Sequence, residues 1–579
     1  MKPLYALAAV SLLSFPGLAQ DATPAETPVA APAVSASEPA PLRTDVPASM
    51  AVLVPDDATI LLVTRPLAEL EDAASSIIAE VDPEMAAAVS VDMLLAQALP
   101  PGFDATAIDR TRPLGLAVGP IAMAPDPQPY FLIPTANPDA IKSALPMGGE
   151  GFPTRISEGY LGITMGREYG VSTGSSELLT RVPAGLLGLT VDLESILADM
   201  RPVIDSTVML ARMQIEAMEG DLDAMGLDQG MDLAALMDAY FDMFNGFLDS
   251  VTSMGMSLDL DDSMLDLRVE HGLAEASPMA GLAQGGGTDL SRVLPLIGDE
   301  SFAMVAAAEW GQLMEDMDPF FALLLGAYPP EMAESLQASI DAAESLYELF
   351  GSTVAMGGNF SEDGMRISTY YVAQDQAALL ARYDELMMEP YWEAIGMRYV
   401  DTKKGVLGEV ELTRYTFDFD LEAMLALSGE ELGEEELDPI MSLMDVIYGD
   451  QLVMTFAQVG DLGVMTLGDD DEFVKAAIER ASAAGGAGPA DMSRLSGLAA
   501  RSHPFMSYRL DLGKLLSTIL PLVEDSMGAP ASGIRMYEGA SMPLNFYLGI
   551  DPSAWTTGVM IDLVLLAEFA AMMEAISDL

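Results

Sequence analysis

A short glycine-rich motif is the most specific hint of chemistry in this chain. Gly170, Val171, Ser172, Thr173 and Gly174 spell G-x-S-x-G, a pattern that presents the nucleophilic serine of many hydrolases on a sharp turn between a strand and a helix. The residues around it predict a strand before the turn and a helix after it. The chemistry would be attack of the Ser172 hydroxyl on an ester or amide carbonyl, assisted by a histidine base.

The sequence offers little to complete such a hydrolase. Its two histidines, His271 and His503, stand in no recognisable motif, and we expect both to be surface or hydrogen-bonded structural residues. A related stretch at Gly463 carries Met465 where the first stretch has Ser172, which indicates that the local backbone does not need a nucleophile. Single strands and helices do not alternate as the parallel sheet beneath such a turn requires. We therefore expect no catalytic residue, with an extracytoplasmic hydrolase as the alternative function.

Residues 221–232 partly imitate a calcium-binding loop. Asp221, Asp223, Gly226 and Asp232 fall at positions 1, 3, 6 and 12 of that motif, but Met225 occupies position 5, where an oxygen ligand is needed. The aspartate at position 12 also replaces the usual glutamate. We interpret the segment as a polar connection between helices, with an acidic ion-binding protein as the alternative.

The sequence contains no clear binding motif for a transition metal. The chain has no cysteine, and its two histidines are more than two hundred residues apart, so a zinc site is not expected. The 41 methionines could offer thioethers to Cu(I), but they are spread among Leu, Ala and Phe rather than clustered at short spacings. Such methionines fit a flexible apolar core or surface better. We expect no metal and no cofactor.

The net charge of the chain is strongly acidic. It has 89 Asp and Glu residues against 26 Lys and Arg, a formal net charge of -63 at pH 7. Phosphate binding needs a basic face, so nucleic acid is not expected as a partner. A surface of this charge repels itself at low salt and is relieved by screening, which is typical of adaptation to a saline medium.

The first residues predict export. Residues 1–19 have a lysine near the start, an apolar run from Leu4 to Phe15 and small residues at the end, as signal peptides have. Residues 20–49 are rich in Pro, Ala, Ser and Glu and predict a disordered linker. No later segment offers the roughly 20 apolar residues that a membrane-spanning helix needs. We expect a periplasmic or secreted protein with no transmembrane segment in the mature chain.

The secondary-structure elements that would position any site occur twice in the sequence. Residues 189–205 and 508–524 align without a gap, so that Asp192 matches Asp511 and Pro202 matches Pro521. Each copy predicts a short strand, a helix capped by the aspartate, and a kink or an end at the proline. Apolar residues at helical spacing predict that one stripe of each helix faces a core. In the first copy the stripe consists of Leu193, Ile196, Leu197, Met200, Val203 and Ile204.

The duplication predicts two halves. QGGGTD at residues 284–289 is typical of a linker, between a first half at 50–283 and a second half at 290–579. The first half would carry a helical insertion at 209–253, and the second an acidic loop at 428–438.

Each half predicts consecutive hairpins with helices between them. A turn is expected at Ser361 to Gly364 in the second half and around Pro125 in the first, and helices are expected to open near Pro138 and near Asp375. This order indicates antiparallel sheets with helices packed on one face. We predict an α+β fold built as two tandem, structurally similar halves.

A family resemblance agrees with this outline. The signal peptide, the Pro/Ala linker, an opening P-D-x-A strand at Pro55 to Ala58 and the repeated strand, Asp-Leu, helix units resemble exported bacterial proteins of a domain-of-unknown-function type. The resemblance covers most of the mature chain. It implies an extracytoplasmic, duplicated α+β body and supplies no active-site residue.

Apolar helices are the remaining candidates for a function. Residues 231–251 and 317–332 have more apolar side chains than one helix stripe requires. Such helices can hold a lipid, an apolar peptide or a helix of a partner protein, or they can bury one another between the halves. We expect a non-enzymatic protein with a binding or envelope-structural role that uses an apolar groove or helix surface.

The acidic composition generates a first prediction. The melting temperature should rise between low and molar NaCl, because added ions screen the repulsion among carboxylates that folding brings together. Thermal unfolding followed by circular dichroism at both salt concentrations measures the shift. A melting temperature that stays level or falls would contradict adaptation to a saline medium.

Overall fold

The structure, a computed structural model, divides the chain into two compact units. The N-terminal unit comprises Ala36–Gln214, Phe241–Ala283 and Ile550–Leu579, and the C-terminal unit is formed chiefly by Gln284–Gly549. The residues described are 46–81, 105–119, 129–145, 152–164, 177–225, 233–261, 263–275, 277–283, 287–310, 349–361, 364–373, 375–386, 397–419, 451–468, 470–483, 488–515, 541–567 and the single residues 312, 325, 337 and 517.

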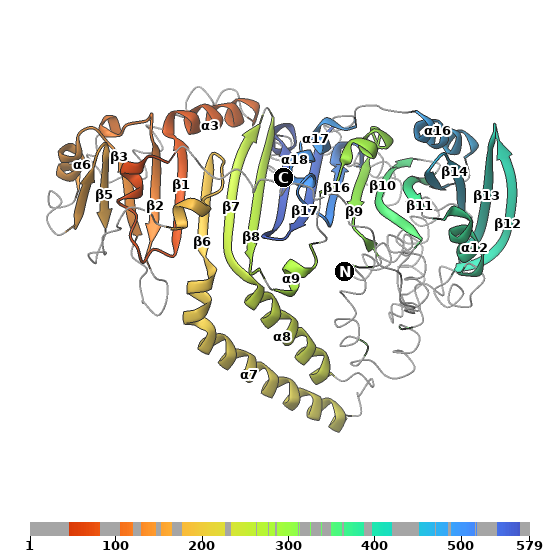
Figure 1. Cartoon of the computed structure of the whole chain (residues 1–579), viewed down its shortest axis with the longest axis horizontal. Helices are drawn as coiled ribbons and strands as arrows, with labels where there is room; N and C mark the ends of the chain where they lie inside the picture. The colour runs from red at the N-terminus through yellow and green to blue at the C-terminus, as the bar shows by residue number, and fades with distance from the viewer. Residues whose placement is uncertain are drawn as a thin grey trace, which may run out of the picture. The chain divides into compact units, whose positions relative to one another are not determined.

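The N-terminal unit is built on an antiparallel sheet (Figure 1). Its strands pair in the order β4-β5-β3-β2-β1-β6-β7-β8-β18, and each pair is antiparallel. The strands are β1 (Ile60–Pro66), β2 (Pro113–Val118), β3 (Pro129–Pro134), β4 (Thr154–Ser157), β5 (Tyr160–Thr164), β6 (Leu187–Asp192), β7 (Val251–Asp261), β8 (Met264–Leu273) and β18 (Ala554–Asp562). The last of these comes from residues that the sequence assigns to the second half, 290–579, yet it pairs with β8 along its whole length.

The strands of the C-terminal unit also pair antiparallel. Its strands pair in the order β12-β13-β14-β15-β11-β10-β9-β16-β17. They are β9 (Phe302–Ala307), β10 (Phe350–Ser361), β11 (Gly364–Ala373), β12 (Met397–Leu407), β13 (Val410–Phe419), β14 (Gln451–Val459), β15 (Leu462–Leu467), β16 (Phe505–Asp511) and β17 (Pro543–Asp551). Ser361 pairs with Gly364 where β10 turns into β11, so the predicted turn is confirmed.

Helices and two apolar clusters cover the N-terminal sheet. The helices are α2 (Ala48–Ala51), α3 (Leu67–Val81) and α6 (Pro138–Ala144), with short 3-10 turns at Ala105–Ala107 and Glu177–Arg181. The unit also contains α9 (Pro278–Gly281). Leu132 and Ile133 are consecutive in β3 but belong to different buried clusters. Since consecutive side chains of a strand point to opposite faces, both faces of the sheet are covered here, rather than one as the sequence suggests.

The C-terminal unit places α16 (Asp471–Ser482) against β14 and β15. Its other helices are α12 (Gln376–Leu386), α17 (Ala490–Ser493) and α18 (Ser496–Ala499), with 3-10 turns at Leu290–Arg292 and Leu294–Leu296. Helix starts follow the predicted caps: Asp375 Oδ1 accepts hydrogen bonds from the backbone N–H of Ala377 and Ala378, both at 3.0 Å. Asp470 caps α16 in the same way, accepting from Glu472 N at 2.8 Å.

A long helical hairpin departs from the prediction made for residues 189–205. Helix α7 (Leu193–Met225) continues through Pro202 instead of ending there, and α8 (Leu233–Ser250) leads back into β7 (Figure 1). Two ion pairs join the helices, Arg201–Asp249 at 2.8 Å and Arg212–Asp242 at 3.3 Å. The expected insertion at 209–253 therefore begins inside a continuous helix, and its last residues belong to β7.

The predicted core stripe of this helix is also wrong in part. Met200 is 40% exposed and Val203 is 47% exposed, although both were assigned to the stripe that faces a core. Every residue of α7 from Leu193 to Gln214 is at least partly exposed. Among the described residues, the ion pairs of this stretch with another element are those with α8, so little of its surface is covered. The matching helix after Asp511 lies mostly outside the described residues, Pro521 included.

Within the part of the chain that the structure describes, no helix is both long enough and apolar enough to cross a membrane.

Candidate functional site

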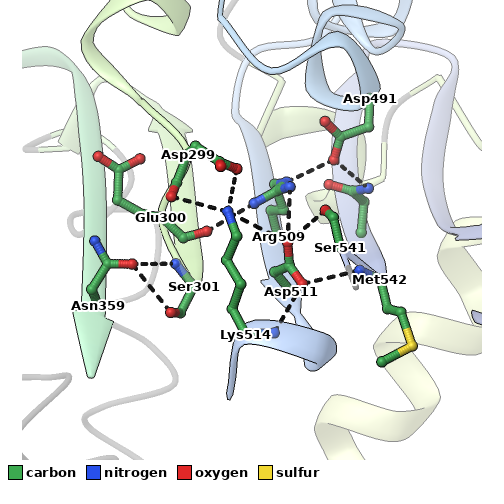
Figure 2. Close-up of polar contacts among 11 residues, drawn as sticks. Asp299, Glu300, Ser301, Asn359, Asp491, Arg509, Asp511, Lys514, Ser541 and Met542 are labelled. Atoms are coloured by element: carbon green, nitrogen blue, oxygen red, sulfur yellow. Dashed lines mark hydrogen bonds and ion pairs between the residues drawn. The ribbon is translucent and has the colours of Figure 1, made fainter. Parts of the chain in front are cut away.

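A group of buried charges lies where β16 runs between β9 and β17 (Figure 2). Alternate residues of β16 point to opposite faces, and Ser507, Arg509 and Asp511 are at most 4% exposed. Met506 and Tyr508, on the other face, are 43% and 36% exposed. The polar side of this strand is thus its buried side.

Arg509 is the centre of the group. Its Nε donates to Asp491 Oδ2 of α17 at 2.8 Å, and its Nη1 donates to the backbone oxygen of Glu300 at 3.0 Å. Asn545 on β17 donates from Nδ2 to the same Asp491 oxygen at 3.1 Å. The guanidinium therefore ties together the end of the loop before β9, the strand β16 and the short helix α17.

Asp511 is the second node and is fully buried. Its carboxylate accepts hydrogen bonds from Ser541 Oγ at 2.7 Å, from Met542 N at 3.0 Å and from Lys514 N at 3.3 Å. The ammonium of Lys514 lies 3.8 Å from it and forms an ion pair with Asp299 (Figure 2). The aspartate thus caps the following helix, as predicted, and also compensates buried positive charge.

A third ion pair lies at the neighbouring strand β10. The carboxylate of Glu300, whose side chain is 5% exposed, pairs with Arg480 of α16. Gly357 on β10 leaves room for it, because a Cβ there would lie 3.0 Å from the Glu300 carboxyl carbon. Arg480 Nη1 also donates to the backbone oxygen of Leu296 at 3.3 Å.

These groups form a structural cross-link and lack the arrangement of a catalytic centre. Each carboxylate of Asp491, Asp511 and Glu300 is already neutralised by an arginine or a lysine. Ser541 donates to an aspartate directly, without the intervening histidine that a serine nucleophile uses. Buried ion pairs of this kind favour one packing arrangement over others, because an unpaired partner would be left without solvation.

The two histidines lie in different units and take part in packing. His503 Nδ1 is 3.3 Å from Thr288 Oγ1, and burial lowers its pKa below the usual range although Glu309 opposes the shift. His271 on β8 contacts Phe247 and Trp555, with ring centroids 6.2 Å and 5.6 Å away, and burial lowers its pKa as well. Among the described residues, the contacts of both histidines are those of packing, and neither has a hydrogen bond to a serine side chain.

The other sequence candidates are only partly described. Ser172 and its motif, residues 170–174, lie outside the described residues, as does the acidic loop at 428–438. Asp221 and Asp223 lie within α7, which runs to Met225, so the first positions of the supposed calcium loop are helical. Among the described residues, no group of three or more His, Asp or Glu side chains is arranged to hold a metal ion.

No protein-family model matches the chain, and neither a curated protein nor a solved structure matches it.

Sequence reasoning missed Arg509, Asp491 and Glu300. A signal was present, since Ser507, Arg509 and Asp511 alternate with Met506, Tyr508 and Leu510. The usual rule places the apolar side of such a strand inside, and here the polar side is inside. Arg509 and Asp511 lie on the same face of the strand and can compensate each other's charge when buried. This pair was the one indication that the polar face is the buried face.

The two duplicated aspartates give a second prediction. Asp192→Ala should reduce the free energy of unfolding by about 1 kcal/mol, because it removes a cap that accepts from Ser195 N at 3.1 Å. Asp511→Ala should reduce it by about 3–5 kcal/mol, because Arg509 and Lys514 lose a buried counter-charge. Urea unfolding of both variants measures the difference. Asp511→Asn keeps an acceptor oxygen without the charge, so its loss of unfolding free energy should lie between those of the two alanine variants. Equal losses for the two alanine variants would contradict the different roles of the two aspartates.

His271 gives a third prediction. Its pKa is lowered by burial in the folded state, so below about pH 6.5, the ordinary histidine value, the unfolded state binds a proton that the folded state resists. The resulting loss in the free energy of unfolding is absent above that pH and grows as the pH falls. The free energy of unfolding should therefore drop more steeply between pH 7 and pH 5 in the native chain than in His271→Phe. Parallel pH profiles of the two proteins would contradict a buried neutral histidine.

Proposed function

We propose that this chain is an exported, non-enzymatic binding protein of two tandem, structurally similar α+β halves, with its contact surface on α7. The surface, called the outer face, consists of Val203, Met209, Leu210 and Met213. The observation that carries the proposal is their exposure, between 47% and 60%, on a helix with no fully buried residue from Leu193 to Gln214.

The tandem halves are supported by the order of the strands. When the strands of each unit are placed in the order in which they pair, two series correspond: β5-β3-β2-β1-β6-β7 and β15-β11-β10-β9-β16-β17. The hairpin β12–β13 extends the second series only. Asp192 N donates to Thr59 O at 2.8 Å, and at the matching place Asp511 N donates to Ser301 O at 2.7 Å.

This correspondence changes one comparison made from the sequence. Gly463 pairs with Tyr371 of β11, and Leu161 pairs with Ile133 of β3, so Gly463 matches Leu161 rather than Gly170. The presence of Met465 in the second half therefore says nothing about Ser172.

The last strands of the halves add a further argument. Matched residues of β7 and β17 are separated by a constant number of positions in the sequence. The same separation makes Ser263 correspond to Ser553 and Leu273 to Leu563. Leu273 N donates to Ser553 O, and Leu563 N donates to Ser263 O, both at 2.8 Å. Strands β8 and β18 thus pair reciprocally, through corresponding residues.

The outer face lies opposite the side of α7 that meets α8. At 3.6 residues per turn, Arg201, Ile204, Val208 and Arg212 fall on one side of the helix, and all four are only partly exposed. Val203, Leu210 and Met213 fall on the other side, Met209 lies between the two sides, and all four are exposed. Exposed Ser206 and Thr207 lie between Val203 and Leu210, so the apolar side chains form a group with a polar interruption. A group of exposed apolar side chains is typical of an interaction surface.

The spacing of the outer face favours a helical partner. Val203, Leu210 and Met213 lie at i, i+7 and i+10, which is the spacing of the apolar positions in a coiled-coil seam. A partner helix could pack along this stripe, because α7 is about 50 Å long at 1.5 Å per residue. With the predicted signal peptide, such contacts would be made outside the cytoplasm, in the periplasm or in the medium.

The proposal yields a fourth prediction. The double variant Leu210→Ser/Met213→Ser should change the free energy of unfolding by less than about 0.5 kcal/mol, because both side chains are exposed. It should at the same time lose binding of a synthetic neutral helix with leucines at heptad spacing and glutamines elsewhere, measured by fluorescence anisotropy. The control is Leu132→Ala, at a fully buried site, which should cost about 2–5 kcal/mol.

Two results would oppose the proposal. A destabilisation of several kcal/mol by the double variant would mean that the outer face is part of a core. A native chain that does not bind the neutral helix, or binds it equally well with the double variant, would remove the outer face as a contact surface.

A further inference from the structure

We propose that the partner of the outer face is a cationic amphipathic helix, one with Lys or Arg beside its apolar stripe. This inference rests on the proposed function and specifies the chemistry of the partner at the same surface.

The charge of the hairpin is the first argument. Residues 193–250 contain 12 acidic residues and 2 basic ones, so their net charge is 2 - 12 = -10. The two basic residues are Arg201 and Arg212, and each forms ion pairs with carboxylates of the hairpin itself. The hairpin therefore has an excess of negative charge and no surplus arginine or lysine.

The position of the carboxylates is the second argument. Asp199 is exposed on α7 and precedes Val203 by one helical turn, on the same side of the helix. Asp205, 59% exposed at its side chain, lies at the border between the outer face and the side that meets α8. Acidic residues that flank an apolar seam select basic residues at the flanking positions of the partner helix.

The same charge disfavours two other occupants. A second copy of this chain would bring an identical acidic hairpin against the first, and like charges across an interface are unfavourable. An anionic lipid surface would be repelled by a chain with a net charge of -63. A cationic helix satisfies both the apolar stripe and the carboxylates around it.

The experiment compares three synthetic helices of equal length with leucines at heptad spacing. Lysine, glutamine or glutamate fills the remaining positions, and binding to the purified full chain is measured by fluorescence anisotropy at about 0.15 M salt. We expect the lysine helix to bind at least about tenfold more tightly than the glutamine helix, and the glutamate helix to bind least.

Matched variants separate specific binding from general attraction to an acidic protein. Val203→Ser/Leu210→Ser/Met213→Ser should weaken binding of the lysine helix at least about tenfold. Ile156→Ser/Val400→Ser/Val406→Ser removes three exposed apolar side chains elsewhere at the same net charge, and it should leave binding unchanged. Asp199→Asn/Asp205→Asn should weaken binding of the lysine helix about threefold or more and leave binding of the glutamine helix unaffected.

The outcomes distinguish this inference from the proposed function. Equal binding of the lysine helix by both triple variants would overturn the inference, because the attraction would then be unspecific. If the glutamine helix bound as tightly as the lysine helix and depended on the outer face, the proposed function would stand and the cationic partner would be wrong. If no helix binding depended on the outer face, both would fail. Binding of phosphatidylcholine vesicles that depends on the outer face would replace the helix by a lipid surface.

Discussion

The backbone pairing of β8 with β18 is the contact on which the N-terminal unit depends. Without it, β8 would present a row of unpaired N–H and C=O groups at a sheet edge, and such an edge can pair with strands of other chains. The strand that closes this edge is separated from β8 by nearly three hundred residues of sequence. A contact of such sequence separation forms only after a large loss of chain entropy, so the N-terminal sheet is complete only when the last part of the chain has joined it.

The proposed duplication explains which features the backbone requires and which it does not. Asp192 and Asp511 make the same backbone contact and cap the same kind of helix. Their neighbours differ, because Thr190 stands where β16 has Arg509, and Gly255 stands where β17 has Asn545. The same strand arrangement therefore forms with or without a buried arginine. The ion network of the C-terminal unit is an addition that fixes the packing of α17 and the loop before β9.

Local features could be predicted from the sequence, and contacts between distant segments could not. The turn at Ser361, the caps at Asp375 and Asp511, and the antiparallel hairpins depend on a few adjacent residues, and the structure confirms them. The partner of β18 and the buried polar side of β16 depend on what packs from elsewhere. Helix α7 continues through Pro202, although proline removes one backbone hydrogen bond and its ring crowds the carbonyl one turn earlier. Arg201 beside it is held by Asp205 and Asp249.

The charge of the chain and the exposure of the outer face depend on each other. An apolar stripe on a projecting helix would normally lead copies of a protein to associate. A net charge of -63 opposes that association, since each copy repels the next. The ion pairs Arg201–Asp249 and Arg212–Asp242 meanwhile hold α8 along one side of α7 and keep the outer face directed away from it. The acidic surface would thus disfavour association of copies through the outer face and favour the proposed partner of opposite charge.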